Sequence, residues 1–84
     1  MKIIKISSAW CPSCIIVDNI LEELDVTIEP LDAFQDIEKI KEYNPGNIMP
    51  ILIFVDKNNQ ELERLIGEQK KENIVNLITK YKNL

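Results

Sequence analysis

Hydrophobic residues follow two spacings along this chain, which predict strands alternating with helices. Short apolar or alternating runs predict four strands, at residues 2–7, 26–31, 50–55 and 61–66. Apolar residues three or four positions apart predict three helices, the first over residues 12–24. The order of elements is therefore βαβ, then α, then ββα.

The strands differ in how much of each is expected to be buried. Residues 50–55 form a continuous apolar run, which is typical of a central strand, whereas Pro30 favours an edge position for strand 26–31. Residues 57–60 predict a hairpin turn into strand 61–66. A βαβ unit implies parallel pairing and a hairpin antiparallel pairing, so we expect an α/β fold with a mixed four-stranded sheet and helices on both faces.

The second and third helices are predicted from shorter signals. Asp32 with Gln35 three residues later resembles a capping box, and Asn44 begins the turn that ends this helix. Its apolar face is made of Phe34, Ile37, Ile40 and Tyr43. The apolar stripe of the C-terminal helix is made of Ile74, Leu77, Ile78 and Tyr81.

Length and charge narrow the function classes. The 84 residues suit one small domain, 1–84, and ten basic against fourteen acidic residues give a net charge of -4. Scattered basic residues argue against nucleic acid as the main partner. No apolar run is long enough to span a membrane, and the apolar stretch at residues 3–6 is too short for a signal peptide. We expect a cytoplasmic monomer without a membrane partner.

The only two cysteines, Cys11 and Cys14, allow four interpretations. A zinc site needs about four ligands, and the chain has no histidine, so a metal would require two chains. A structural disulfide would close a very short loop and add little stability. A redox pair fits better, because Cys11 falls where a strand gives way to a helix. The unpaired N–H groups of that first turn would lower the pKa of its thiol. The alternative of two inert buried thiols stays open.

The segment Trp10-Cys11-Pro12-Ser13-Cys14 resembles the active site of the thioredoxin family. The resemblance covers nearly the whole chain, because Ile48-Met49-Pro50 resembles the family's cis-proline segment and Gly67 resembles the glycine after its last strand. It implies a minimal thioredoxin-like fold, because the chain starts at the strand that leads into the cysteines. It also implies a thiol–disulfide oxidoreductase with no cofactor beyond the two cysteines.

Roles for single residues follow from the same resemblance. Cys11 would be the attacking thiol and Cys14 the resolving one, while Met49 would offer its backbone to an extended substrate segment. The implied substrate-binding surface is made of Trp10, Pro12, Ser13, Met49, Pro50 and Gly67. Each of the larger landmarks also has a structural interpretation. Pro50 can simply open a strand, Trp10 can be a core aromatic, Met49 a gap filler and Gly67 a turn residue.

The chain departs from the glutaredoxin pattern, although Pro12 resembles that group. Glutaredoxins usually hold glutathione with Thr-Val before the cis-proline and Gly-Gly further on, and here those places read Ile48-Met49 and Gly67-Glu68. Glu68 would repel the acidic tripeptide, which disfavours glutathione as the partner. The residues between the cysteines match neither subfamily, so they leave the direction of the redox reaction open.

A second departure concerns the strand before the cysteines. Thioredoxins usually place a buried aspartate six residues before the first cysteine, and here that residue is Lys5. Glu29 lies near the place of the lysine that often pairs with it. We therefore hypothesise a charge-swapped pair of Lys5 and Glu29 beneath the disulfide, tuning a thiol pKa or moving a proton. The alternative is that both are solvated charges at the sheet edge.

The resulting functional prediction is a reductase of protein disulfides, with protein substrates and a thioredoxin reductase-type electron donor as partners. The rival enzymes are an electron donor dedicated to one target, such as ribonucleotide reductase, and a glutaredoxin-like relative. The rival from another class is a thioredoxin-fold binding protein without turnover, docking through Trp10, Met49 and Pro50.

Overall fold

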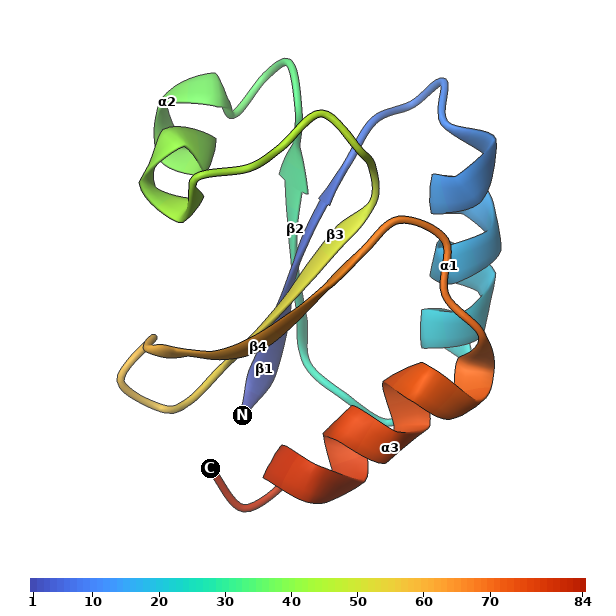
Figure 1. The fold of residues 1–84 in the computed structure, drawn as a ribbon, viewed down its shortest axis with the longest axis vertical. Coiled ribbons are helices and arrows are strands. Elements are labelled where there is room, and N and C mark those ends of the chain that lie inside the picture. Colours follow the sequence, from blue (N-terminus) through green and yellow to red (C-terminus); the bar gives the residue numbers. More distant parts are fainter.

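The chain folds into strands and helices in the predicted order, as the computed structural model of residues 1–84 shows (Figure 1). The elements are β1 (Lys2–Ser7), α1 (Pro12–Glu22), β2 (Ile28–Asp32), α2 (Ile37–Ile40), the 3-10 turn η1 (Lys41–Tyr43), β3 (Ile51–Val55), β4 (Glu61–Ile66) and α3 (Lys71–Tyr81). The strand runs and the first and last helices were thus predicted to within a few residues.

The four strands form one mixed sheet in the order β2-β1-β3-β4. β1 pairs with β2 in parallel and with β3 antiparallel, and β3 and β4 form an antiparallel hairpin. All five residues of β3 are buried, which confirms it as a central strand, and β2, which carries Pro30, lies at the edge. The parallel and antiparallel pairings confirm the expected α/β architecture.

Helices cover both faces of the sheet, but unequally. α1 and α3 pack against one face, where Val17 and Ile74 join a core cluster with Phe54. α2 covers the other face, where Ile40 packs with Ile4 and other strand residues. In Figure 1, α1 and α3 lie on one side of the twisted sheet and α2 on the opposite side, near its upper end.

The alternation of side chains along β1 decides which face receives each residue. Ile3 belongs to the cluster under α1 and α3, whereas Ile4 and Ile6 belong to the cluster under α2. Because successive side chains of a strand point to opposite faces, Lys5 shares the face of Ile3 and lies toward α1. A charged side chain therefore enters the helix-covered side of the sheet.

The second helix is much shorter than predicted. It starts at Ile37, and Phe34 lies before it with 71% of its surface exposed instead of on a buried helix face. The Asp32 carboxylate accepts hydrogen bonds from the backbone N–H groups of Phe34 (2.8 Å) and Gln35 (2.9 Å). The return bond of the predicted capping box comes from Asp36 and not from Gln35, since the Asp32 N–H donates to the Asp36 carboxylate at 2.7 Å. Such side-chain bonds close a turn that competes with the helix, which begins one turn later than predicted.

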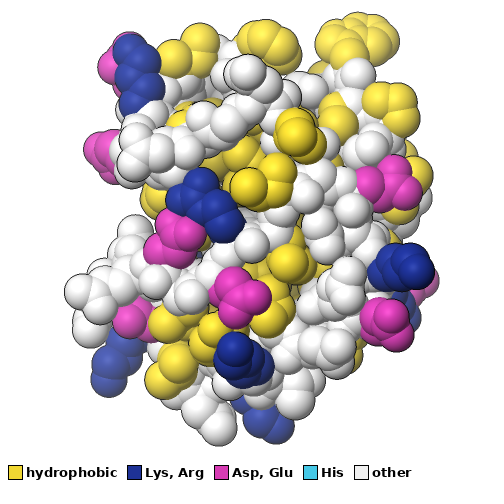
Figure 2. Space-filling model, in the orientation of Figure 1, with side chains coloured by type: hydrophobic (Ala, Val, Ile, Leu, Met, Phe, Trp, Pro, Cys, Tyr) yellow, Lys and Arg dark blue, Asp and Glu magenta, His cyan; other side chains and the backbone are white.

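Charged and hydrophobic side chains are distributed differently over the surface. On the face seen in Figure 2, charged side chains of both signs are scattered, whereas hydrophobic side chains line the upper edge and also reach the surface in the centre and at the lower left. That edge is the end of the sheet at which β1 leads into α1 in Figure 1. The surface therefore offers an apolar area at one end and no large patch of a single charge on this face.

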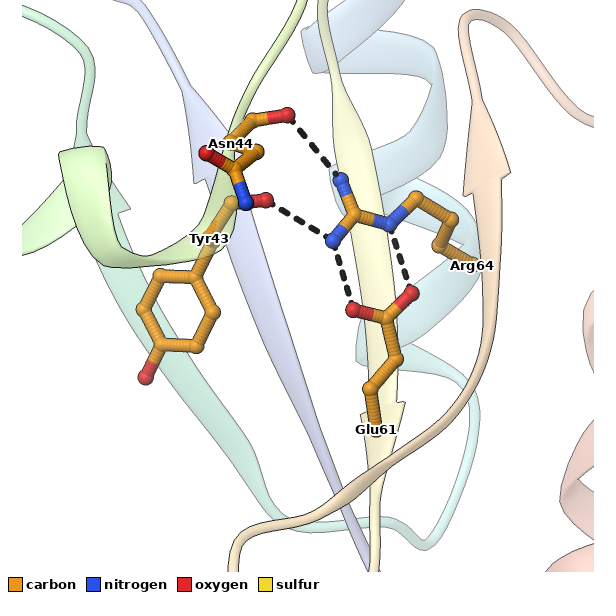
Figure 3. A network of polar contacts seen from close by, with 4 residues as sticks. All are labelled: Tyr43, Asn44, Glu61 and Arg64. Atoms are coloured by element: carbon orange, nitrogen blue, oxygen red, sulfur yellow. Dashed lines mark hydrogen bonds and ion pairs between the residues drawn. The ribbon is translucent and has the colours of Figure 1, made fainter.

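Arg64 of β4 fixes the end of η1 to the sheet (Figure 3). Its guanidinium donates to the carbonyl oxygens of Tyr43 (2.8 Å) and Asn44 (3.5 Å) and to both carboxylate oxygens of Glu61. Asn44 has the left-handed backbone (φ 50°) that commonly ends a helix. This network, the Arg64 clamp, holds the point where the chain leaves α2 and η1 for the loop to β3.

Candidate active site at the start of α1

The start of α1 aims backbone N–H groups at the first cysteine. Cys11 is the N-cap residue, with extended backbone, and its Sγ accepts a hydrogen bond from the N–H of Cys14 at 3.1 Å. Pro12 occupies the first helical position, where its missing N–H costs nothing, and no acidic residue lies in the first turn. The helix end therefore offers partial positive charge to the Cys11 sulfur and favours its thiolate form after reduction.

The two cysteines are joined by a disulfide bond, with their Cα atoms 5.1 Å apart. Their accessibility differs, because Cys14 is 2% exposed whereas Cys11 is only half-buried. An incoming molecule therefore meets the sulfur of Cys11 first.

Two other segments reach the same end of the molecule. The Met49–Pro50 peptide bond is cis, and Pro50 is buried directly before β3. The Gly67 N–H donates to the Pro50 carbonyl oxygen at 2.8 Å, and the Ser13 hydroxyl donates to the Glu68 carboxylate at 3.1 Å. These contacts link the proline segment, the turn after β4 and the residues between the cysteines into one site.

Gly67 is more than a turn residue at this position. Its φ of +86° lies in the region that side-chain-bearing residues rarely adopt, and a Cβ built on it would lie 3.3 Å from Cγ2 of Ile48. The left-handed backbone and the close packing against Ile48 each require a residue without a side chain, which explains the glycine at this position.

The surface around the cysteines is apolar and exposed. Trp10 is 92% exposed, so it is not a core aromatic, and Ile48 and Ile66 are exposed as well. This agrees with the hydrophobic edge in Figure 2. Met49 is half-buried, and its backbone N–H and carbonyl groups make no hydrogen bond within the protein. The site thus combines apolar surface with a free backbone edge, as β-strand addition requires.

The hypothesised pair of Lys5 and Glu29 is wrong. Lys5 Nζ contacts the carboxylate of Asp18 on α1, whereas Glu29 binds Lys2 (2.7 Å) and Lys39 (3.3 Å). The reason is the strand register, since Glu29 stands beside Ile4 and so faces α2, while Lys5 faces α1. The hydrogen bond from Lys2 is the main reason why the pKa of Glu29 is lowered.

Asp18 is the one charged neighbour of this region that the sequence interpretation missed. It lies four residues after Cys14 on the same helix, which places the two side chains about 5–6 Å apart at their Cβ atoms. The spacing from Cys14 was the available signal, but Lys5 was paired with a strand residue because the strand register was not known.

No group of three or more His, Cys, Asp or Glu side chains in the structure is arranged to hold a metal ion. None of the helices combines the length and apolar character needed to cross a membrane.

Comparison with known proteins gives a consistent picture, although no family model matches the sequence. A thioredoxin of Chlamydia pneumoniae is 31% identical over 77 residues, which cover 86% of this chain and 74% of that protein. A prophage-derived thioredoxin-like protein of Bacillus subtilis is 26% identical, with 86% and 89% covered. Thioredoxin 1 of Thermosipho africanus has the same fold, with a TM-score of 0.79, 22% identity, and 99% and 96% covered.

Proposed function

The chain belongs to the thioredoxin family of thiol–disulfide oxidoreductases, and we propose that within this family it reduces disulfide bonds of other proteins. The redox-active group is the Cys11–Cys14 disulfide itself. The observation that carries the proposal is the unequal pair, with Cys11 accessible at a helix N-terminus and Cys14 buried behind it.

The first step uses the accessible sulfur. In the reduced protein, the Cys11 thiolate attacks one sulfur of a substrate disulfide, which forms a mixed disulfide and releases the other substrate sulfur as a thiolate. The N–H of Cys14, 3.1 Å from Sγ of Cys11 in the oxidised form, stabilises the attacking thiolate. This makes Cys11 the nucleophile at neutral pH.

The second step uses the buried sulfur. Cys14 loses its proton and attacks Sγ of Cys11, so the intramolecular disulfide forms and the second substrate sulfur leaves as a thiolate. Substrate leaves with two more electrons than it brought, and the protein holds the disulfide. Because Cys14 is 2% exposed, it attacks only the sulfur beside it and not a second substrate molecule.

The substrate is held as an extended segment beside the disulfide. The free backbone N–H and carbonyl of Met49 would pair with it, and the exposed Trp10 and Ile48 would cover its apolar side chains. Pro12 lines the approach to Cys11, while Ser13 is linked to Glu68 at the rim. The Glu68 carboxylate at the rim favours neutral or basic substrate segments over acidic ones, and it therefore disfavours glutathione.

The dithiol must be restored by an electron donor, and we propose a reductase of the thioredoxin reductase type. One solved structure with this fold is thioredoxin f2 in complex with ferredoxin:thioredoxin reductase, at 18% identity and a TM-score of 0.70. Such recycling fits the cytoplasm, where thiols are kept reduced.

The test is reduction of a protein disulfide driven by dithiothreitol, followed by assays with NADPH plus thioredoxin reductase or with glutathione. We expect turnover in the wild type, none in Cys11→Ser, and an accumulating mixed disulfide in Cys14→Ser. A trapped adduct on Cys11 identifies the nucleophile directly.

Three outcomes would contradict the proposal. Retention of the cellular function in a Cys11→Ser, Cys14→Ser double variant would favour a thioredoxin-fold binding protein. A strongly oxidising potential against defined thiol buffers, together with no reductase-driven turnover, would instead indicate an oxidant. Turnover with a single target only, such as ribonucleotide reductase, would favour the dedicated donor.

A further inference from the structure

The proton of the Cys14 thiol needs a destination in this protein. Cys14 is 2% exposed, and no polar or charged side chain of the molecule is buried to the same degree. A buried thiol in apolar surroundings resists ionisation, so attack by Cys14 is slow unless a nearby group takes the proton. The candidates one helical turn away are charged residues at the boundary between α1 and the sheet.

Lys5 and Asp18 form an ion pair at that boundary. Of the side chains in the molecule's ion pairs, Lys5 is the least exposed, at 16%, and Asp18 is 38% exposed. Asp18 follows Cys14 by one helical turn on the inner side of α1. Lys5 comes up from β1 on the same side of the sheet, so the pair lies just beyond Cys14 along the helix.

An open cavity joins the ion pair to solvent. It has a volume of about 310 Å³ and is lined by Lys5, Asp18, Leu21, Glu22, Ile28 and Pro30. A water molecule occupies about 30 Å³ of liquid, so the cavity has room for several, and its polar wall offers hydrogen-bond partners. A proton delivered to Asp18 therefore has a route out that does not pass through the substrate.

We propose that Asp18 accepts the proton of Cys14 during resolution of the mixed disulfide, and that Lys5 positions the Asp18 carboxylate for this role. The inference rests on the proposed function and adds a proton acceptor to its second step. The S–H bond of Cys14 breaks as its proton passes to Asp18, directly or through one cavity water. The sulfur electron pair then forms the bond to Sγ of Cys11, and the bond from Cys11 to substrate breaks. Asp18 returns the proton to solvent through the cavity.

The charges around Asp18 define the expected pH behaviour. Lys5 faces it from β1 and Glu22 lies one turn further along α1, while β2 contributes only Ile28 and Pro30 to the cavity. β3 places the apolar Leu52 beside Lys5 in the sheet. Asp18 is thus the only carboxylate in direct contact with Lys5, and Glu22 provides a matched control on the same cavity wall.

The first experiment measures the rate of mixed-disulfide resolution in single turnover between pH 5 and 10. At pH 7 we expect Asp18→Asn to lower this rate about a hundredfold, at the weak end of general-base effects, and Glu22→Gln to leave it unchanged. The deficit should fade above about pH 9, where hydroxide ionises a thiol without help. Lys5→Met should lower the rate as well, because the Asp18 carboxylate then loses the cation that positions it.

The second experiment does not depend on turnover. In a Cys11→Ser background Cys14 is the only cysteine, and the ultraviolet absorbance of its thiolate can be followed against pH. Asp18→Asn should lower the midpoint pH of this titration and Lys5→Met should raise it, each by about 0.5–1 unit, because unlike charges stabilise the thiolate and like charges oppose it. Far-ultraviolet circular dichroism checks that each variant is folded.

The outcomes separate the two proposals. An active wild type whose Asp18→Asn variant keeps the same pH profile and rate would overturn the proton-transfer role alone. Titration midpoints that do not move with either substitution would overturn it as well, since a proton acceptor must sense the thiolate. A wild type that reduces no disulfide at any pH would overturn the proposed function instead.

Discussion

The two faces of the sheet are covered in different ways, and only one of them carries chemistry. On one face lie α1 and α3, each eleven residues long, with the disulfide and the Lys5–Asp18 pair in the same layer. On the other face lies α2, four residues long and extended only by η1. A long helix packs against the sheet along its whole length, which fixes its direction and so keeps its N-terminal N–H groups pointed at a sulfur.

The α2 face is held instead by polar contacts to the backbone. Asp32 satisfies two N–H groups before α2, and the Arg64 clamp satisfies two carbonyl oxygens at the end of η1. Neither group touches the cysteines. Changes on this face should therefore alter stability and leave the chemistry of the pair intact, whereas changes on the α1 face should alter both.

The largest effect should come from the core, where adjacent residues of β3 face opposite ways. Leu52 is buried under α1 and α3, and Ile53 is buried under α2. We expect Leu52→Ala to lower the free energy of unfolding by about 4 kcal/mol and Ile53→Ala by about 2 kcal/mol, within the range for such truncations. Each substitution leaves a cavity in the core. The two long helices α1 and α3 hold the cavity at residue 52 open, whereas the short α2 can move into the cavity at residue 53.

Urea denaturation of the two variants measures this difference, and each serves as the control for the other. Equal losses would mean that α2 is as rigidly held as α1. A larger loss for Ile53→Ala would reverse the comparison between the faces.

The next effect should come from the Arg64 clamp. Arg64→Met removes the donors to Tyr43 and Asn44 and leaves Glu61 without its partner, so we expect a loss of about 1–2 kcal/mol in stability. The rate of mixed-disulfide resolution should stay within about twofold of the wild type. Urea denaturation and single-turnover kinetics on the same protein separate the two effects.

The pH dependence of stability separates the two parts of the clamp, the ion pair with Glu61 and the hydrogen bonds to the backbone carbonyl oxygens. The hydrogen bond from Arg64 lowers the pKa of Glu61. A lowered carboxyl pKa contributes stability that is present above the ordinary glutamate pKa of about 4.3 and is lost as pH falls through the lowered value. The difference between Glu61→Gln and wild type at pH 7 should therefore shrink as pH falls through the lowered pKa, while Arg64→Met stays less stable throughout. A Glu61→Gln deficit that persists in acid would contradict this assignment.

The sequence was sufficient for the features that depend on local pattern. The continuous apolar run at residues 50–55 predicted a central strand, and all five residues of β3 are buried. The place of Cys11 between a strand and a helix predicted that its sulfur meets the unpaired N–H groups of the first turn, and its sulfur does accept a backbone N–H there. Both signals are contained in a few neighbouring residues.

The predictions that failed concern features that depend on residues far apart in the chain. The length of α2 is set by the Asp32 turn and by the Arg64 clamp, which joins residues 20 and 21 positions apart. The partner of Lys5 is set by the register of β1 and β2, in which a shift of one residue moves a side chain to the opposite face. No pattern within β1 alone reveals that Lys5 meets α1 and not Glu29.

Glu29→Gln should have the smallest effect on stability, and it is the sharpest test of whether the two faces of the sheet act separately. Glu29 stands on the strand beside Lys5 but faces α2, where it binds Lys2 and Lys39. We expect a stability loss below about 1 kcal/mol at pH 7, because such partly exposed pairs contribute little. Since Lys2 lowers the pKa of Glu29, this loss should disappear as pH falls through that lowered value. The rate of resolution should not change at any pH.

Comparison with Asp18→Asn completes this test, because the two variants each remove one carboxylate, from opposite faces of the same sheet. If Glu29→Gln also slowed mixed-disulfide resolution, charge would act on Cys14 through the sheet. The face that a residue occupies would then no longer predict its role.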